Sequence, residues 1–221
     1  MLLYRPVGLL ELRLMHASAL KAFPPRLPEQ PIFYPVLNRE YARQIASEWN
    51  TKSAPFAGYV TEFEVQDAYL ARFEAHIVGG RQHEELWVPA EELAEFNRHL
   101  LSQIRVVEAH FGKDFQGLPA ENTALKGKTA IEQFVWLAAA FEQKPLEAAA
   151  ELKANSAAVF LHFPFWPSTT SAPGASLPVC AKRRSPRSKN PGPCPSPIFT
   201  WGSHKQKRSA QTRRLSGKYL K

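Results

Sequence analysis

The sequence predicts an α+β protein: a sheet of short strands with flanking helices, then a helical extension and a basic tail. Strand-like apolar runs, one with a clean two-residue alternation, recur between residues 1 and 118. Short segments with helical spacing of apolar residues separate these runs. Residues 119 to 167 are mainly helical in pattern, and residues 168 to 221 are rich in proline and serine. We therefore expect an α+β core, a helical extension and a disordered tail within these bounds.

The positive charge of the chain is concentrated in the tail. The formal net charge is +8, but residues 168 to 221 hold 12 Lys and Arg residues and no acidic residue. The remaining 16 basic residues stand against all 20 acidic ones, so residues 1 to 167 are mildly acidic. Two interpretations of the tail follow: an arm that contacts nucleic acid or another anionic partner, or an extension without function. We favour the second, because a charge run alone is weak evidence for a partner.

The composition argues against several classes of protein. With 44% apolar and 22% charged residues, the chain resembles globular rather than fibrous or membrane proteins. No apolar run reaches the length of a bilayer span, so we expect no membrane association and a cytoplasmic location. Both cysteines, Cys180 and Cys194, lie in the tail. The histidines of the body show no paired ligand spacing, so we expect no metal site.

The first third of the chain predicts two strand–helix units. Residues 2–7 predict a short strand, and residues 9–20 have the apolar spacing of a helix. Four prolines within residues 22–31 exclude helix and central strand, which leaves an extended loop. Residues 32–38 predict a second strand. Asn38 is a suitable N-cap for the next helix, which should bury Tyr41, Ile45 and Trp49 on one stripe.

The middle of the chain is rich in strands. Residues 59–65 alternate between two faces, and residues 67–78 predict a short helical turn followed by a strand. An apolar strand follows at residues 85–88. Pro89 then opens a helix over residues 90–101, and residues 103–111 predict another strand.

The extension begins with a clear helix signal. Thr129 and Glu132 form a capping box for a helix over residues 130–143, and a second helix follows Pro145. The apolar segment 157–166 predicts a buried strand or a docked segment. The Gly-Lys-Thr at 127–129 does not indicate a phosphate loop. Its required upstream glycine is replaced by Asn122, and no buried strand precedes it.

Three polar residues on distant predicted strands form a candidate binding or catalytic site. Arg5 lies in the first strand, Tyr34 in the second, and Glu85 begins an apolar strand, where burial disfavours its charge. Side chains from separate strands can converge on one cleft. Glu84 and Glu85 point to opposite faces of their strand, so only one of them can face such a cleft.

The order of these segments resembles the ADP-ribosyltransferase fold. LYRPVGLLELRLMHASALKAF resembles its first strand and helix, and IFYPVLNREYARQIASEW its second strand and helix. EELWVPAEELAEFNRHLLSQIRVV resembles the strand that is headed by the catalytic glutamate. Residues 3 to 108 also resemble small bacterial and fungal proteins labelled ADP-ribosylation or crystallin-like. The resemblance implies a split sheet, mixed or antiparallel, with short flanking helices.

The resemblance also implies a donor and a set of roles. The donor is NAD, whose nicotinamide–ribose bond is cleaved before transfer to an acceptor. Glu85 would stabilise the oxocarbenium-like transition state, and Arg5 would bind the phosphates or ribose. Tyr34 would stack on the nicotinamide, the loop with Arg26 would cover the donor, and His83 would serve the acceptor side.

A second hypothesis belongs to another class: a non-catalytic binding or chaperone-like module that retains the fold. Two features support it. The set Arg5, Tyr34 and Glu85 mixes the Arg-led and His-led branches of the family, and the apolar segment 157–166 is a possible partner surface. The acceptor is left open between protein, nucleic acid and water.

Overall fold

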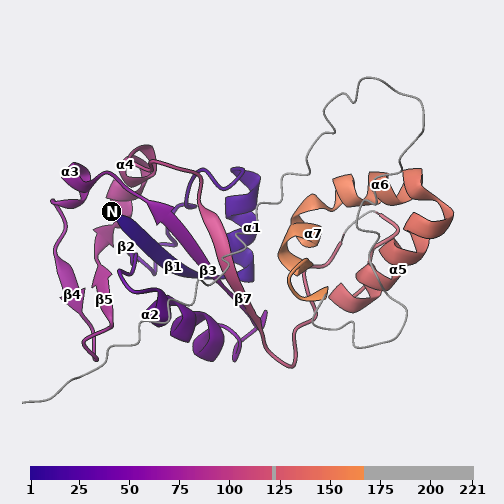
Figure 1. Ribbon diagram of the computed structural model, residues 1–221, viewed down its shortest axis with the longest axis horizontal. Helices are drawn as coiled ribbons and strands as arrows, with labels where there is room; N and C mark the ends of the chain where they lie inside the picture. The colour runs from indigo at the N-terminus through magenta and orange to yellow at the C-terminus, as the bar shows by residue number, and fades with distance from the viewer. Residues whose placement is uncertain (121–122, 167–221) are drawn as a thin grey trace, which may run out of the picture.

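An antiparallel sheet organises the molecule (Figure 1). The computed structural model describes residues 1–120 and 123–166, which belong to the α+β class as expected. The predicted tail, 168–221, lies outside the described residues. The three central strands, in spatial order, are β1 (Leu2–Gly8), β3 (Ala57–Glu64) and β7 (Arg105–Phe111).

Two further segments extend the sheet beyond β1. Val36 pairs with Tyr4 on one side and with Glu85 on the other. These bridges connect β1 to β5 (Glu84–Leu86), which pairs with the edge strand β4 (Ala75–Ile77). Figure 1 shows β4 and β5 at the end of the molecule remote from α5 and α6. The elements that the sequence predicts from distant parts of the chain therefore lie in one sheet.

The predicted second strand is regular only in part. Its first residues form β2 (Ile32–Phe33), which pairs with β6 (Val88–Pro89). These pairs and the Val36–Glu85 bridge belong to one antiparallel register, which is interrupted around Pro35. Pro35 has no N–H to donate, so the ladder cannot continue through it. The carbonyl of Pro35 still accepts from the N–H of Leu86 at 2.8 Å.

Helices cover both faces of the sheet. The helix α1 (Leu9–Ala17) lies on the face where Leu3, Val7, Tyr59 and Phe63 are buried. The opposite face is covered by α2 (Arg39–Gln44) and the π-helix η1 (Ile45–Trp49). Three short helices lie near the ends of the strands: α3 (Asp67–Leu70), η2 (Ala90–Glu92) and α4 (Leu93–Arg98). The strand β3 is therefore buried on both faces.

The predicted helix after Asn38 forms, but its geometry changes midway. The side chain of Asn38 accepts from the N–H groups of Glu40 and Tyr41, which confirms the cap. The helix then widens into η1, whose i→i+5 spacing turns its later residues relative to the expected stripe. Trp49 is consequently 56% exposed instead of buried. Ala46 is buried in its place, against the sheet.

The described part of the extension contains three helices. They are α5 (Ala130–Gln143), α6 (Pro145–Ala154) and α7 (Ser156–His162). The capping box of Thr129 and Glu132 is confirmed. The strand interpretation of residues 157–166 is wrong, because this segment begins with helix α7. Its side chains are buried almost all round, so it lacks the periodicity that separates helix from strand.

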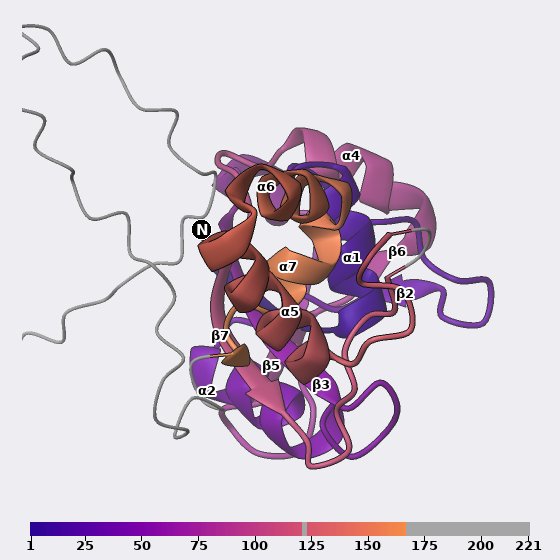
Figure 2. The same cartoon turned by 90° about the vertical axis from the view of Figure 1, so that its right-hand side faces the viewer.

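The extension shares a core with the N-terminal part of the chain. Figure 1 and Figure 2 show α7 as the helix of the extension beside α1. Phe160 and Leu161 of α7 belong to the same apolar cluster as the α1 face of the sheet. The hydroxyl of Tyr59 donates to the carbonyl of Leu161 at 2.8 Å. None of the helices in the described ranges is both long and apolar enough to cross a bilayer.

The contact between β3 and η1 requires a glycine at position 58. A Cβ atom on Gly58 would lie 2.1 Å from the carbonyl oxygen of Ala46, which is backbone and cannot rotate away. We expect Gly58→Ala to lower the free energy of unfolding by about 1–3 kcal/mol. Gly8→Ala is the control, because a Cβ there has no neighbour within 4 Å. Equal urea midpoints for the two variants would contradict this account.

The buried His162 should make the fold sensitive to acid. Its Nε2 accepts from the N–H of Leu118 at 2.7 Å, and burial lowers its pKa from 6.5 to about 4. The unfolded chain then binds the proton first, so stability is complete above pH 6.5 and falls as pH drops towards 4. We expect a loss of about 2–3 kcal/mol at pH 4.5 relative to pH 7.5. His162→Gln, which does not titrate, should lose less in urea unfolding; an identical acid loss would refute the assignment.

Candidate functional site

Arg5 is buried in an ion pair on the α1 face of the sheet. Its side chain comes from β1, and the carboxylate of Glu11 comes from the first turn of α1, directly after Gly8. The Arg5 Nε donates to Glu11 Oε1 at 2.9 Å and an Nη donates to Oε2 at 3.3 Å. The other Nη donates to the carbonyl of Tyr34 at 3.1 Å. Arg5 is 6% exposed, and all three guanidinium nitrogens have partners within the chain.

Arg26 joins the same ion pair from the proline-rich loop. One of its Nη atoms lies 3.6 Å from Glu11 Oε1, and its Nε donates to the carbonyl of Ile32 at 3.2 Å. Burial lowers the pKa of Arg26, and the nearby charge of Arg5 lowers it further. The cluster of Arg5, Glu11 and Arg26 thus connects β1, α1, the loop and β2. Two cations around one carboxylate give it a net positive charge.

Glu85 lies on the opposite face of the sheet. The bridges from Tyr4 to Val36 and from Val36 to Glu85 place these three side chains on one face. Arg5 follows Tyr4 in β1, so its side chain points to the other face, where α1 lies. The structure therefore does not bring Arg5 and Glu85 to one cleft. Glu84, the neighbour of Glu85, also points away from the Glu85 side.

Aromatic and imidazole rings border Glu85. The indole N–H of Trp87 donates to Glu85 Oε1 at 2.9 Å. The imidazole of His76, which is the cross-strand neighbour of Glu85, stacks on the Trp87 ring with a centroid distance of 4.4 Å. The ring of Tyr34 packs edge-on against Trp87 at 6.1 Å. Glu85 itself is only 9% exposed, whereas Trp87 is 44% exposed.

A second stacked pair lies on the same face. The rings of Tyr41, from α2, and His83 stack with a centroid distance of 4.3 Å. His83 Nε2 is 3.2 Å from Gln44 Oε1. Burial raises the pKa of Tyr41, and the negative charge of Glu85 raises it further, which indicates that the carboxylate is close to the phenol. We name the Glu85 face by its residues: Tyr34, Tyr41, His76, His83, Glu85 and Trp87.

The structure thus divides the predicted site residues into two groups. Tyr34, His83 and Glu85 share the Glu85 face, while Arg5 and Arg26 belong to the cluster on the α1 face. Tyr34 connects the two, since its carbonyl accepts from Arg5 and its ring contacts Trp87. Four further residues of these two groups were not predicted from the sequence as site residues: Glu11, Tyr41, His76 and Trp87. A signal existed for Trp87, because positions 83, 85 and 87 share one side of a strand.

The absence of a basic partner distinguishes Glu85. Among residues 1–120 and 123–166, no lysine or arginine forms an ion pair with it. Buried carboxylates in proteins are usually paired, because the loss of hydration disfavours an isolated charge. The hydrogen bond from Trp87 engages one of its two oxygens. The arrangement can therefore accept a hydrogen bond or a positive charge from a ligand.

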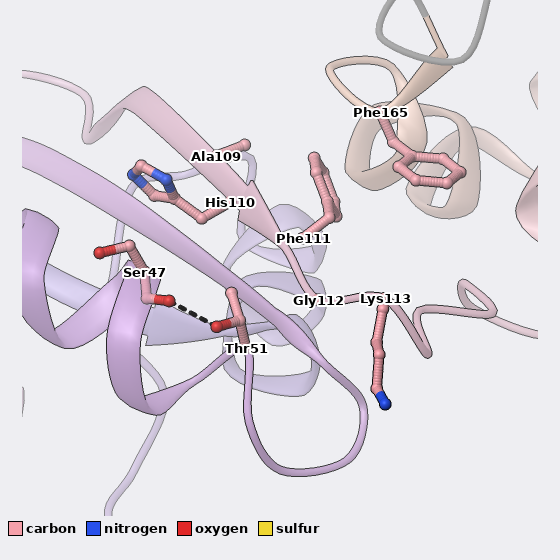
Figure 3. A pocket seen from close by; sticks show the side chains of 8 residues that line it. All are labelled: Ser47, Thr51, Ala109, His110, Phe111, Gly112, Lys113 and Phe165. Atoms are coloured by element: carbon pink, nitrogen blue, oxygen red, sulfur yellow. Dashed lines mark hydrogen bonds between the residues drawn. The ribbon is translucent and has the colours of Figure 1, made fainter.

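A separate open pocket of about 520 Å³ lies where β7 ends (Figure 3). It is lined by Ser47, Thr51, Ala109, His110, Phe111, Gly112, Lys113 and Phe165. The rings of Phe111 and Phe165 meet at 5.1 Å, and Lys113 points away from His110 (Figure 3). His110 Nε2 is 3.4 Å from Glu108, whose pKa is lowered by hydrogen bonds from Arg43. The polar groups that line this pocket do not converge on one point, so we favour the Glu85 face as the candidate site.

No group of three or more side chains in the described part of the chain is arranged to hold a metal ion. We compared the chain with protein-family models, curated proteins and solved structures, and none of these comparisons found a match. The resemblance to ADP-ribosyltransferases therefore stays a prediction from the sequence.

The ion pair of Arg5 should contribute strongly to stability. Glu11→Gln removes the carboxylate charge and leaves the buried guanidinium without its counter-ion. We expect the free energy of unfolding to fall by about 3 kcal/mol in urea titrations. The matched control is Glu147→Gln, which breaks the exposed pair with Lys144 and should change little. If both variants unfold at the same urea concentration, Arg5 is not held by this charge.

Proposed function

We propose that this chain is a binding module of ADP-ribosyltransferase-like architecture that binds NAD through the Glu85 face. The observation that carries the proposal is the nearly buried Glu85 carboxylate, which lacks a basic partner in the described chain and lies beside the exposed Trp87 and Tyr34 rings. Aromatic faces next to a carboxylate suit the planar nicotinamide ring, which is positively charged in NAD.

Arg5 is not available to a ligand on the Glu85 face, so the proposed binding rests on Glu85 and the rings around it. Its guanidinium lies across the sheet from Glu85, and its donors are taken by Glu11 and the Tyr34 carbonyl. To reach a donor phosphate on the Glu85 face, Arg5 would have to leave a buried ion pair. The phosphate-binding role that the resemblance gives to Arg5 is therefore not supported by its contacts.

A cytoplasmic location fits this proposal, because residues 1 to 167 contain no cysteine that needs an oxidising compartment.

A second candidate is ADP-ribosyl transfer from NAD to an acceptor whose identity is open. One observation favours it: Tyr34 and Glu85 both contact Trp87. These are the residues that the resemblance assigns to nicotinamide stacking and to stabilisation of the sugar cation. In this candidate, Glu85 would have to stabilise the sugar cation without a donor contact from Arg5.

The decisive experiment is calorimetric titration of the full chain with NAD, combined with chromatographic detection of released nicotinamide. We expect NAD to bind the wild type and Glu84→Gln equally. Glu85→Gln should bind about tenfold more weakly, because one charge-assisted contact is lost. Glu84 is the matched control, since it is adjacent in sequence and points to the other face.

The same experiment separates the two candidates. Binding without nicotinamide release supports the binding module. Release that disappears in Glu85→Gln would establish the transferase instead. If NAD does not bind to the wild type, neither candidate stands.

A further inference from the structure

We infer that the Glu85 face selects planar organic cations by their positive charge, with a pyridinium or guanidinium group as the recognised chemistry. The inference rests on the proposed function for the location of the site, and it adds the property of the ligand that is recognised. It predicts that the charge of the ligand, and not its aromatic shape alone, determines affinity.

The comparison with other carboxylates in the molecule supports this inference. Glu62 is buried and pairs with Arg105. Glu108 pairs with both Arg39 and Arg43. Glu11, described above, likewise has two arginine partners. Glu85 is as well buried as these residues, yet it has no such partner in the described chain. A ligand cation would supply what arginine supplies elsewhere in this protein.

The rings around Glu85 favour a planar cation. Trp87 and Tyr34 are exposed and meet edge to face, so their rings present surfaces in different orientations. The π-faces of indole and phenol attract a cation electrostatically. A flat cation can stack on Tyr34, or on the part of Trp87 that His76 leaves exposed, while its positive edge contacts the carboxylate. A compact tetrahedral ammonium can contact Glu85 but has no flat face to stack.

The two histidines of the face do not replace this partner. His76 stacks on Trp87, and His83 stacks on Tyr41 while its Nε2 contacts Gln44. Neither imidazole forms an ion pair with Glu85 in the described residues.

Two ligands of nearly the same shape test the inference. 1-Methylnicotinamide is a planar cation, and nicotinamide is its neutral counterpart. Methylguanidinium supplies a second planar cation, and tetramethylammonium supplies a compact one. Each is titrated into the full chain at pH 8 and low salt, with binding followed by ligand-observed NMR. The proteins are the wild type, Glu85→Gln and the control Glu84→Gln.

We expect the wild type and Glu84→Gln to bind 1-methylnicotinamide at least about tenfold more tightly than nicotinamide. Methylguanidinium should also bind, and tetramethylammonium should bind more weakly than either planar cation. Glu85→Gln should lose the preference for the charged ligand. Circular dichroism melting verifies that this variant is folded, and the comparison of ligands on the wild type needs no variant.

Equal affinity of the wild type for 1-methylnicotinamide and nicotinamide would overturn the inference, as would an unchanged preference in Glu85→Gln. Tighter binding of tetramethylammonium than of the planar cations would remove the requirement for a flat ligand. If NAD binds without any charge preference among the small probes, only this inference fails. If the planar cations bind but NAD does not, the proposed function fails and the selectivity remains.

Discussion

The ion pair between Arg5 and Glu11 is the interaction on which the rest of the arrangement depends. It joins the first strand to the helix that follows it, and it recruits Arg26 from a loop that has no regular backbone hydrogen bonding. Because Arg5 also donates to the carbonyl of Tyr34, the same group fixes the start of the segment that connects β1 to β5. A buried guanidinium is costly to separate from its carboxylate, so the ion pair holds β1, α1 and the start of this segment together.

The pleat of the sheet places the ion pair and the candidate site on opposite faces. Successive residues of β1 point to opposite sides, so the strand presents Arg5 to α1 and Tyr4 to the side of Val36 and Glu85. The α1 side contains the carboxylate of Glu11 between the guanidinium groups of Arg5 and Arg26, so its charges are held in ion pairs. The Glu85 side contains a carboxylate whose neighbours are rings. The first group is suited to holding the fold together, and the second is suited to holding a ligand.

The geometry of η1 shows how close packing limits this layer. The widened turn places the backbone of Ala46 against Gly58, where no side chain fits. Gly58 therefore allows the close approach of η1, which continues the helix that carries Tyr41. Tyr41 of α2 lies close enough to Glu85 for the negative charge of the carboxylate to raise the pKa of the phenol. At the other end of the sheet, α7 contributes to the same core as α1, so the extension supports the sheet that holds the site.

The sequence by itself determined most of the local structure, because the signals for it are local. Asn38, and Thr129 with Glu132, define helix starts through contacts within one turn, and the prolines before Ile32 exclude regular structure through their own geometry. The sequence also identified Glu85, His83 and Tyr34 as candidate site residues. Only the tertiary structure decided which of these residues meet, because their meeting depends on strand register. A register shift of one residue moves every side chain of a strand to the other face of the sheet. The ion pair of Arg5 with Glu11, and the lack of one for Glu85, could not be read from the sequence. Charged partners are chosen by the folded arrangement of several elements and leave no periodic pattern along the chain.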